Sequence, residues 1–326
     1  MTSFSRREAL RLISGCALAP LLAGCGPARK LRIASHVWPG YELMFLARSL
    51  GWLDERRASL LETASATASM QALADGRADG AALTLDEVLR VRADGVPLSV
   101  VLVFDISAGA DVLLARPGIE SLAGLKGRRI GFEQGAVGTL MLDHALREAG
   151  LAAGEVVQVP LPFDRHEAAW REGALDALIT FEPVAGRLVG AGARALFDSS
   201  SLPDTIVDVL AIRTNLLDAG GEAARHLVSA HLRGLAHLAE HPQDAAYRMA
   251  PRLQLPPDRV LKAFRGLVLP DRDNNRRLLA GPAPALLAGP APALLASARR
   301  IAGLFSPGDS LAGLLRPEFL PEGEVR

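Results

Sequence analysis

Residues 36–42 carry the side chains in this sequence that are best suited to binding a ligand: His36, Trp38, Tyr41 and Glu42. They follow a short apolar run at 31–34 and precede apolar residues at helical spacing at 43–50, which predicts a strand-to-helix turn. Ligands of open α/β sheets bind at such turns. The two aromatic rings could stack on a planar group or line an apolar tail, and His36 could donate a hydrogen bond. The structural alternative is that Trp38 packs against its own helix.

Polar residues after four other predicted strands could complete the site, although each has a structural alternative. Thr84 could instead cap a helix, Asp111 could satisfy backbone amides at a hinge, and Glu182 could cap the helix after it. Residues 134–139 open a helix, so their free N–H groups could bind an anion or a carbonyl. The full set of candidate ligand-binding residues is His36, Trp38, Tyr41, Thr84, Asp86, Ser107, Asp111, Gln134, Gly135, Gly138, Thr139, Thr180 and Glu182.

The charges of these predicted loops bear on the ligand. Asp86, Asp111, Glu182 and Glu42 are acidic, and no Lys or Arg lies among the candidates. A sulfonate or nitrate would have to rely on helix N-termini and neutral donors. A planar, nitrogen-containing ligand, neutral or cationic, fits carboxylates and aromatic rings better.

Neither a cofactor nor a metal ion is expected. Residues 134–139 lack the G-x-G-x-x-G spacing of a dinucleotide site. His237 and His241 form an H-x-x-E-H pattern with Glu240, but Pro242 follows directly, and the residue before a proline disfavours helix. The two imidazoles therefore need not share a face, and we expect no catalytic residue in the chain.

The first 24 residues resemble an export signal that leads to a lipid anchor. Arg6, Arg7 and Arg11 precede an apolar run at 12–22, and residues 22–25, Leu-Ala-Gly-Cys, resemble the lipobox of bacterial lipoproteins. Residues 5–10 also resemble a twin-arginine signal. We expect lipidation of Cys25, a tether at 25–30 and a location in the bacterial cell envelope, facing the periplasm or the cell exterior. The alternative is an incidental Cys25 after an ordinary signal peptide.

The elements that position the candidate residues alternate between short apolar runs and helical patterns, which predicts βαβ units and parallel sheets. The pattern restarts near residue 129, and a Gly-x-x-Asp element at 76–79 recurs at 173–176, each time before a buried strand. Two lobes of one design explain this repetition. The later part is mostly helical, at 221–241, 257–266 and 296–304. Residues 280–287 recur unchanged at 288–295, and we interpret them as a tandem duplication in a surface loop without function.

Length and charge agree with a two-domain binding protein. A chain of 326 residues suggests about two domains. Its 36 basic and 36 acidic residues balance, which favours neither nucleic acid nor an anionic membrane as a partner.

Residues 31 to about 213 resemble the solute-binding proteins of the nitrate, taurine and alkanesulfonate class of ABC importers, a group similar to the thiamine-pyrimidine synthases of fungi. The resemblance rests on Trp-Pro-Gly-Tyr at 38–41, Ala-Arg-Ser-Leu-Gly-Trp-Leu at 47–53, Gly-x-x-Asp at 76–79, Ser-Leu-Ala-Gly-Leu-Lys-Gly at 121–127, Gly-x-x-Asp-Ala at 173–177 and Glu-Pro at 182–183. It implies a type II periplasmic-binding fold with two α/β lobes joined by two hinge strands. Lobe 1 would comprise 31–110 and 206–326, and lobe 2 would comprise 111–205.

This resemblance implies a monomer that holds a small polar molecule between its lobes and delivers it to an ABC permease. Two alternatives remain. The chain could report its ligand to a membrane signalling protein instead of a permease. It could also be an enzyme like the pyrimidine synthases, which use a cysteine-rich motif and iron; a mature chain with Cys25 alone argues against this.

Overall fold

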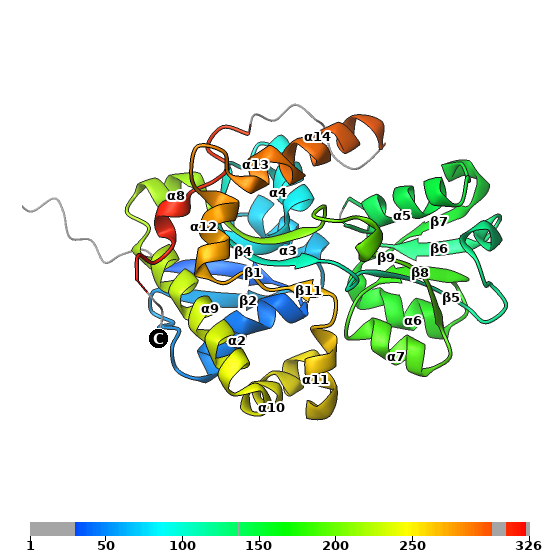
Figure 1. The fold of residues 1–326 in the computed structure, drawn as a ribbon, viewed down its shortest axis with the longest axis horizontal. Coiled ribbons are helices and arrows are strands. Elements are labelled where there is room, and N and C mark those ends of the chain that lie inside the picture. The colour runs from blue at the N-terminus through cyan, green and yellow to red at the C-terminus, as the bar shows by residue number, and fades with distance from the viewer. Residues whose placement is uncertain (1–29, 136, 302–310, 324–326) are drawn as a thin grey trace, which may run out of the picture.

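The computed structural model describes residues 30–135, 137–301 and 311–323, which form two lobes side by side (Figure 1). The expected signal peptide, the tether at 25–29 and Cys25 lie outside the described residues, as do positions 302–304 of the last predicted helix. Among the described residues, no helix is long and apolar enough to cross a membrane.

Each lobe is built on one mixed sheet, and the two sheets share a topology. Lobe 1 has the order β11-β4-β10-β3-β1-β2, and lobe 2 has the order β7-β6-β8-β5-β9. In lobe 1, β1 pairs in parallel with β2 and β3, and β10 runs antiparallel beside β3. In lobe 2, β6 pairs in parallel with β7 and β8, and β5 runs antiparallel beside β8. The strands are β1 (Leu31–Ser35), β2 (Ala58–Glu62), β3 (Gly80–Thr84), β4 (Leu98–Ser107), β5 (Val112–Ala115), β6 (Arg129–Phe132), β7 (Val157–Pro160), β8 (Ala177–Thr180), β9 (Arg194–Asp198), β10 (Val207–Arg213) and β11 (Leu267–Val268).

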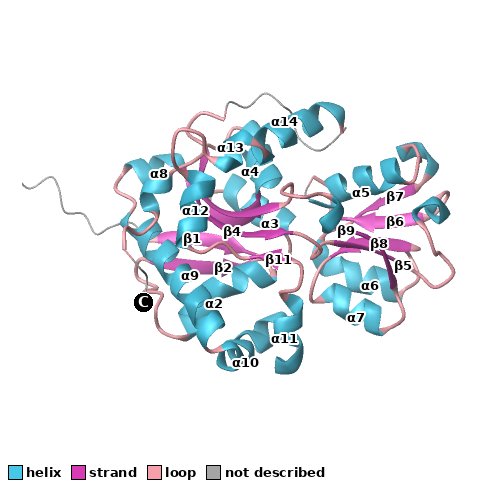
Figure 2. Cartoon of the chain, in the orientation of Figure 1, coloured by secondary structure: helices cyan, strands magenta, loops and turns pink. Residues whose placement is uncertain are grey.

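Helices cover both faces of each sheet, so the central strands are buried on both sides (Figure 2). In lobe 1 they are α2 (Glu42–Ser49), α3 (Ala66–Ala74), α4 (Leu85–Ala93), α8 (Thr214–Asp218), α9 (Glu222–Glu240), α10 (Pro242–Leu253), α11 (Pro257–Ala263), α12 (Arg272–Leu279), α13 (Ala285–Ala288) and α14 (Pro290–Arg300); in lobe 2 they are α5 (Val137–Glu148), α6 (His166–Arg171) and α7 (Val184–Gly190). Short 3₁₀ helices are η1 (Pro39–Tyr41), η2 (Leu122–Leu125), η3 (Ala153–Glu155), η4 (Phe163–Arg165), η5 (Ser199–Ser201) and η6 (Pro317–Phe319).

The repeated Gly-x-x-Asp element makes the same contacts in both lobes. Asp79 accepts hydrogen bonds from the backbone and guanidinium of Arg32, the second residue of β1. Asp176 accepts the same set from Arg129, the first residue of β6. Arg32 also donates to the carbonyl of Gly76, which follows α3, and Arg129 donates to the carbonyl of Gly173, which follows α6. The shared motif therefore joins β1 to the start of β3 in lobe 1 and β6 to the start of β8 in lobe 2.

The sequence patterns did not indicate β5, β9, β11, α8, α10 or α12, and one segment expected as a loop is helical. Residues 242–253 form helix α10, which the sequence analysis did not predict; Pro242 is compatible with it because a proline fits the first turn of a helix. The duplicated residues 280–295 were expected to form a surface loop, but α13 and most of α14 lie there. Leu286 and Leu294, which occupy equivalent positions of the two copies, are both fully buried. The second copy thus adds a helical turn that packs on the core.

Candidate functional site

A pocket lies between the lobes, where the carboxyl ends of β1, β3, β6 and β8 face one another. Its cavity volume is about 40 Å³, which is room for a few water molecules when the lobes are in this arrangement. Lobe 1 and its returning strand contribute His36, Trp38, Tyr41, Ala66, Thr84, Glu87 and Asp208. The crossing segment and lobe 2 contribute Asp111, Glu133, Val137, Gly138, His166, Ile179, Thr180 and Phe181.

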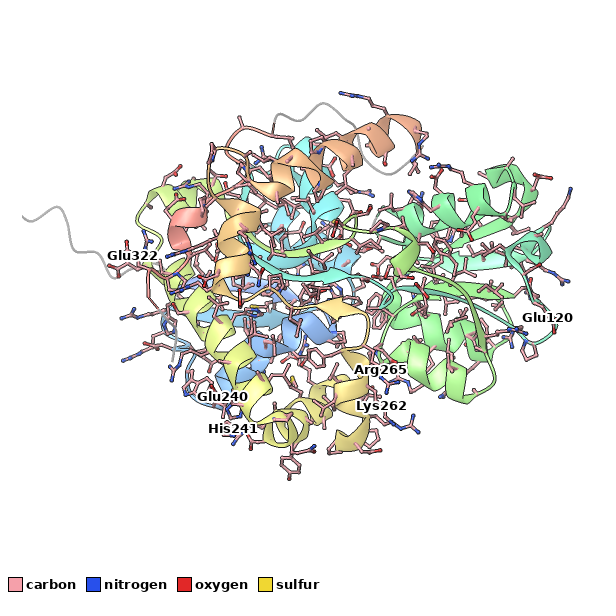
Figure 3. All side chains as sticks on the ribbon, viewed as in Figure 1. Glu120, Glu240, His241, Lys262, Arg265 and Glu322 are labelled. Carbon is pink, nitrogen blue, oxygen red and sulfur yellow. The ribbon has the colours of Figure 1, made fainter. Side chains whose placement is uncertain are left out.

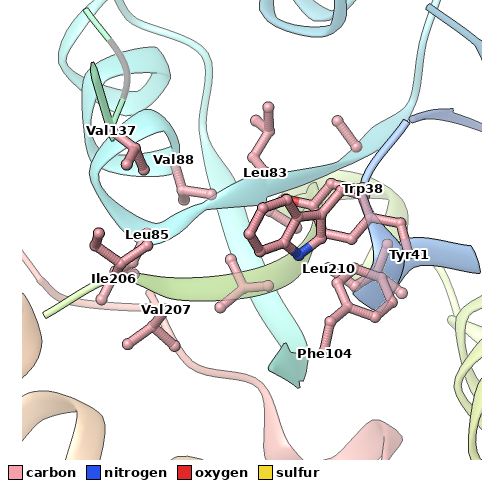
Figure 4. Close-up of a cluster of buried hydrophobic side chains, with 14 of the residues drawn as sticks. Trp38, Tyr41, Leu83, Leu85, Val88, Phe104, Val137, Ile206, Val207 and Leu210 are labelled. Atoms are coloured by element: carbon pink, nitrogen blue, oxygen red, sulfur yellow. The ribbon is translucent and has the colours of Figure 1, made fainter. Parts of the chain in front are cut away.

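The turn after β1 is held against the floor of lobe 1. Trp38 is extended and Pro39 starts η1, so the chain reverses within three residues. Trp38 Nε1 donates to Asp105 Oδ2 at 3.0 Å. A Cβ on Gly40 would lie 1.8 Å from that same Asp105 oxygen, so only glycine allows the turn to approach β4 this closely. Trp38 and Tyr41 lie beside Phe104 of β4 in the close-up of the core (Figure 4).

Aromatic rings from both lobes meet in the pocket. Trp38 and Phe181 make an edge-to-face contact across the cleft, with ring centroids 5.0 Å apart. His36 makes a similar contact with Tyr41 at 5.3 Å, and Phe181 stacks on Phe163 of lobe 2 at 4.2 Å. These contacts give the cleft an apolar wall that spans the lobe boundary.

Two carboxyl groups lie side by side on the hinge strands. Asp105 of β4 and Asp208 of β10 are register partners, so their side chains share one face of the sheet. Tyr41 donates its hydroxyl to Asp208 Oδ1. Burial raises the pKa of Asp105 to about 7 and that of Asp208 well above its usual value.

Asp111 lies at the crossing between the lobes. Its backbone N–H donates to the hydroxyl oxygens of Ser107 and Ser199, so it is the backbone that braces the hinge. Its carboxyl lines the pocket, and the residue is only 4% exposed. The carboxyl atom Oδ2 has no hydrogen-bond partner among the described residues. Burial, with a smaller contribution from the charge of Asp86, raises the pKa of Asp111 to about 7.

Two glutamates of the pocket each accept backbone N–H groups at a helix start. Glu87 Oε2 accepts from Thr84 N–H at 2.9 Å, which fits the capping box predicted before α4. Glu133, after β6 in lobe 2, reaches across the cleft to the first turn of α3 in lobe 1. Its Oε1 accepts from Thr67 N–H at 2.9 Å and from the Thr67 hydroxyl at 2.6 Å. This contact links the two lobes beside the pocket.

Both histidines of the pocket are neutral. Burial lowers the pKa of His36 to about 3, with a smaller contribution from Arg252, and burial lowers that of His166 to about 4. Arg252 lies on the far side of the first turn, where it binds Glu42 and donates to the carbonyl of His36. The described lining of the pocket therefore contains four carboxyl groups and no Lys or Arg.

Cationic side chains gather instead in a second hollow between α7 and α11, outside the pocket. Lys262 near the end of α11 and Arg265 just after that helix lie on the side near lobe 2 (Figure 3). Glu182 belongs to this second hollow, and its Oε2 accepts the N–H of Gly186 at 3.0 Å in the first turn of α7.

Seven of the candidate residues line the pocket and six do not. Those in the pocket are His36, Trp38, Tyr41, Thr84, Asp111, Gly138 and Thr180; those outside it are Asp86, Ser107, Gln134, Gly135, Thr139 and Glu182. Thr139 accepts the N–H of Gly135, so part of the 134–139 loop is satisfied internally. The sequence analysis missed Glu87, Glu133, His166 and Asp208. Asp208 could have been found, because it is an isolated acid within an apolar strand.

Comparison with known proteins places these features in context. A family model described as NMT1/THI5 like matches residues 38–245. An aliphatic sulfonates-binding protein of Escherichia coli (strain K12) is 29% identical over 177 residues, which span 52% of this chain and 56% of that protein.

Solved structures resemble the whole described fold. The alkanesulfonate-binding protein SsuA from Xanthomonas axonopodis pv. citri, bound to MOPS, has a TM-score of 0.70 at 19% identity, covering 92% of this chain and 96% of that one. A ligand-binding component of an ABC-type import system from Staphylococcus aureus, with zinc bound, reaches 0.73 at 14% identity, covering 91% and 100%. The desulfurization enzyme DSZB reaches 0.59 at 19% identity, covering 89% and 97%, so the fold also occurs in an enzyme.

Proposed function

Since the chain belongs to the NMT1/THI5-like family and has the type II fold of periplasmic binding proteins, we propose that it is a solute-binding protein that delivers a small polar organic ligand to an ABC importer. The ligand is nitrogen-containing or sulfonate-like. The observation that carries this proposal is the pocket, whose lining comes from both lobes at the carboxyl ends of four strands. A ligand held there contacts both lobes at once.

Capture by such a site requires only binding and closure. The crossing after β4 and the return into β10 are the two connections between the lobes, so rotation about them opens or closes the cleft. A ligand shifts this equilibrium by the difference between its affinities for the closed and open forms. No covalent step is part of the proposed function.

The proposal is tested by a thermal-shift screen of small amines, amidines, pyrimidines and sulfonates, followed by small-angle X-ray scattering. A ligand at 100 times its Kd should raise stability by about 2.7 kcal/mol and favour the compact form. Phe181→Ala, which removes a ring from the pocket wall, is expected to weaken binding of the best hit at least tenfold. Tyr247→Ala, which removes an exposed ring on α10, is the matched control and should keep affinity within twofold. Equal effects of the two variants would place the ligand elsewhere.

We also propose that Cys25 carries a lipid that holds the protein at the membrane. The proposal rests on the Leu-Ala-Gly-Cys sequence at 22–25 after an apolar run. Cys25→Ser is expected to abolish processing before residue 25 and the mass increase from lipid, and globomycin should block processing of the natural chain. Cys16→Ser is the matched control, and its maturation should be normal. Normal maturation of the Cys25→Ser chain would exclude lipidation at this residue.

A further inference from the structure

We infer that the ligand carries a protonated nitrogen with several N–H donors, an ammonium, amidinium or guanidinium group, which binds between Asp111 and Thr180 in the pocket. The inference rests on the proposed function and specifies its ligand class. It follows from which pocket atoms are left to accept hydrogen bonds and from the signs of the surrounding charges.

Thr180 is fixed as an acceptor by His166. His166 Nε2 lies 3.2 Å from the carbonyl oxygen of Leu161, which can only accept, so this nitrogen carries the proton. In the neutral ring, Nδ1 is then an acceptor, and Thr180 must donate its hydroxyl to it across 3.1 Å. Thr180 is 1% exposed and lines the pocket, so its oxygen has only lone pairs left for a ligand.

Tyr41 is fixed in the same sense. Its hydroxyl hydrogen is used by Asp208 Oδ1, so its oxygen can only accept from a ligand. The carboxyls of Glu87 and Glu133 already accept N–H groups, and Asp111 Oδ2 has no partner among the described residues. These five groups therefore offer acceptors, and the side-chain donors left in the described lining are one N–H of the neutral His36 ring and the hydroxyl of Thr84. A sulfonate, which has acceptor oxygens and no donor, does not complement them, whereas an ammonium or guanidinium group brings three or more donors.

The charges around Asp111 point the same way. The charge of Asp86 raises the pKa of Asp111, and that of Asp111 raises the pKa of Asp105 and Asp208. Glu87 likewise raises the pKa of Asp208. Arg90 acts on Asp86 and packs against Gly135 outside the described lining. Buried carboxylates without a counter-ion are costly, and a cationic ligand would supply one. The rings of Trp38 and Phe181 add a favourable surface for a cation.

Anions and metal ions fit less well. The start of α3, a natural anion site, is already occupied by the Glu133 carboxylate. The start of α5 also lines the pocket, through Val137 and Gly138, but four carboxyl groups share that lining and disfavour an anion there. Among the described residues, no three His, Cys, Asp or Glu side chains are placed to hold a metal ion. An organic cation matches the acceptors, the four carboxyl groups and the aromatic wall together.

The test is isothermal titration of the protein with shape-matched probes that differ in charge: benzylamine against phenylmethanesulfonate, benzamidine against benzoate, and butylamine against butanesulfonate, with ZnCl₂ as a separate arm. The cationic member of at least one pair should bind at least tenfold tighter than its partner. Its affinity should fall as the pH is lowered from 8 to 6, with protons released on binding, because Asp111 must be ionised to pair with it. Asp111→Asn should weaken the cation at least tenfold and leave benzyl alcohol within twofold.

Tighter binding of any sulfonate, or of Zn²⁺ with no organic cation bound, would overturn this inference and leave the proposed function intact. Equal loss of the cation and of benzyl alcohol in Asp111→Asn would also overturn it, because that variant would then act through the shape of the pocket. Absence of binding by every probe, in titration and in thermal shift, would overturn both the inference and the proposed function.

Discussion

Replacing Asp111 by Asn is expected to stabilise the ligand-free protein, by an amount that grows by about 3 kcal/mol between pH 5 and pH 8. The carboxyl has a pKa of 3.8 in the unfolded chain and about 7 when it is buried in the folded protein. Between these pH values the folded protein holds the proton more tightly than the unfolded chain. The natural protein therefore loses stability as the pH rises from about 4 to about 7 through this group, whereas the asparagine variant does not.

The measurement is urea unfolding of both proteins at pH 5 and pH 8, compared as a difference so that the buried histidines cancel. Asp176→Asn in lobe 2 is the matched control. Hydrogen bonds from Arg129 lower the pKa of Asp176 to about 2, so this carboxylate stabilises the fold at every pH above about 4. Its replacement should destabilise the protein equally at pH 5 and pH 8. A stability gain for Asp111→Asn that is the same at both pH values would show that this carboxyl is not titrating in the folded state.

Replacing Glu133 by Ala is expected to shift the ligand-free protein toward the open form by about 2 kcal/mol, or roughly 30-fold in the equilibrium between the forms. Glu133 joins lobe 2 to Thr67 through two hydrogen bonds at the start of α3. Rotation of the lobes away from each other would break both of them. Without the carboxylate, the closed form loses this link and leaves an N–H of α3 without its partner.

Small-angle X-ray scattering should show a larger radius of gyration for Glu133→Ala, and hydrogen exchange should be faster at the amide of Thr67. Glu155→Ala is the control: Glu155 accepts the N–H of Ala152 at 2.9 Å and pairs with Lys126, and both of these partners lie in lobe 2. It should leave the radius unchanged. If Glu133→Ala had the radius of the natural protein and exchanged faster at Thr67 only, Glu133 would be a helix cap without influence on closure.

Most of the fold could be predicted from local patterns. Alternating apolar runs and helical spacing indicated strands and helices in both lobes, because burial of one face imposes a period on the sequence. The Gly-x-x-Asp repeat indicated two lobes of one design, and the structure gives its reason in the paired contacts of Asp79 and Asp176 with arginines. Helix α10 was missed because Pro242 disfavours helix at the residue before it, although the proline itself occupies the first turn of α10.

The sequence by itself determined the aromatic turn at 36–42, the acidic character of the neighbouring loops and the presence of two similar α/β units. These features are local, so neighbouring residues report them. Only the tertiary structure decided which residues each acid meets. Asp208 accepts the hydroxyl of Tyr41, which is 167 residues away, and Glu133 reaches Thr67 from the other lobe. It also decided that His166 turns the Thr180 hydroxyl into an acceptor. Such partners are brought together by strand order and lobe packing, on which the periodicity of a single segment carries no information.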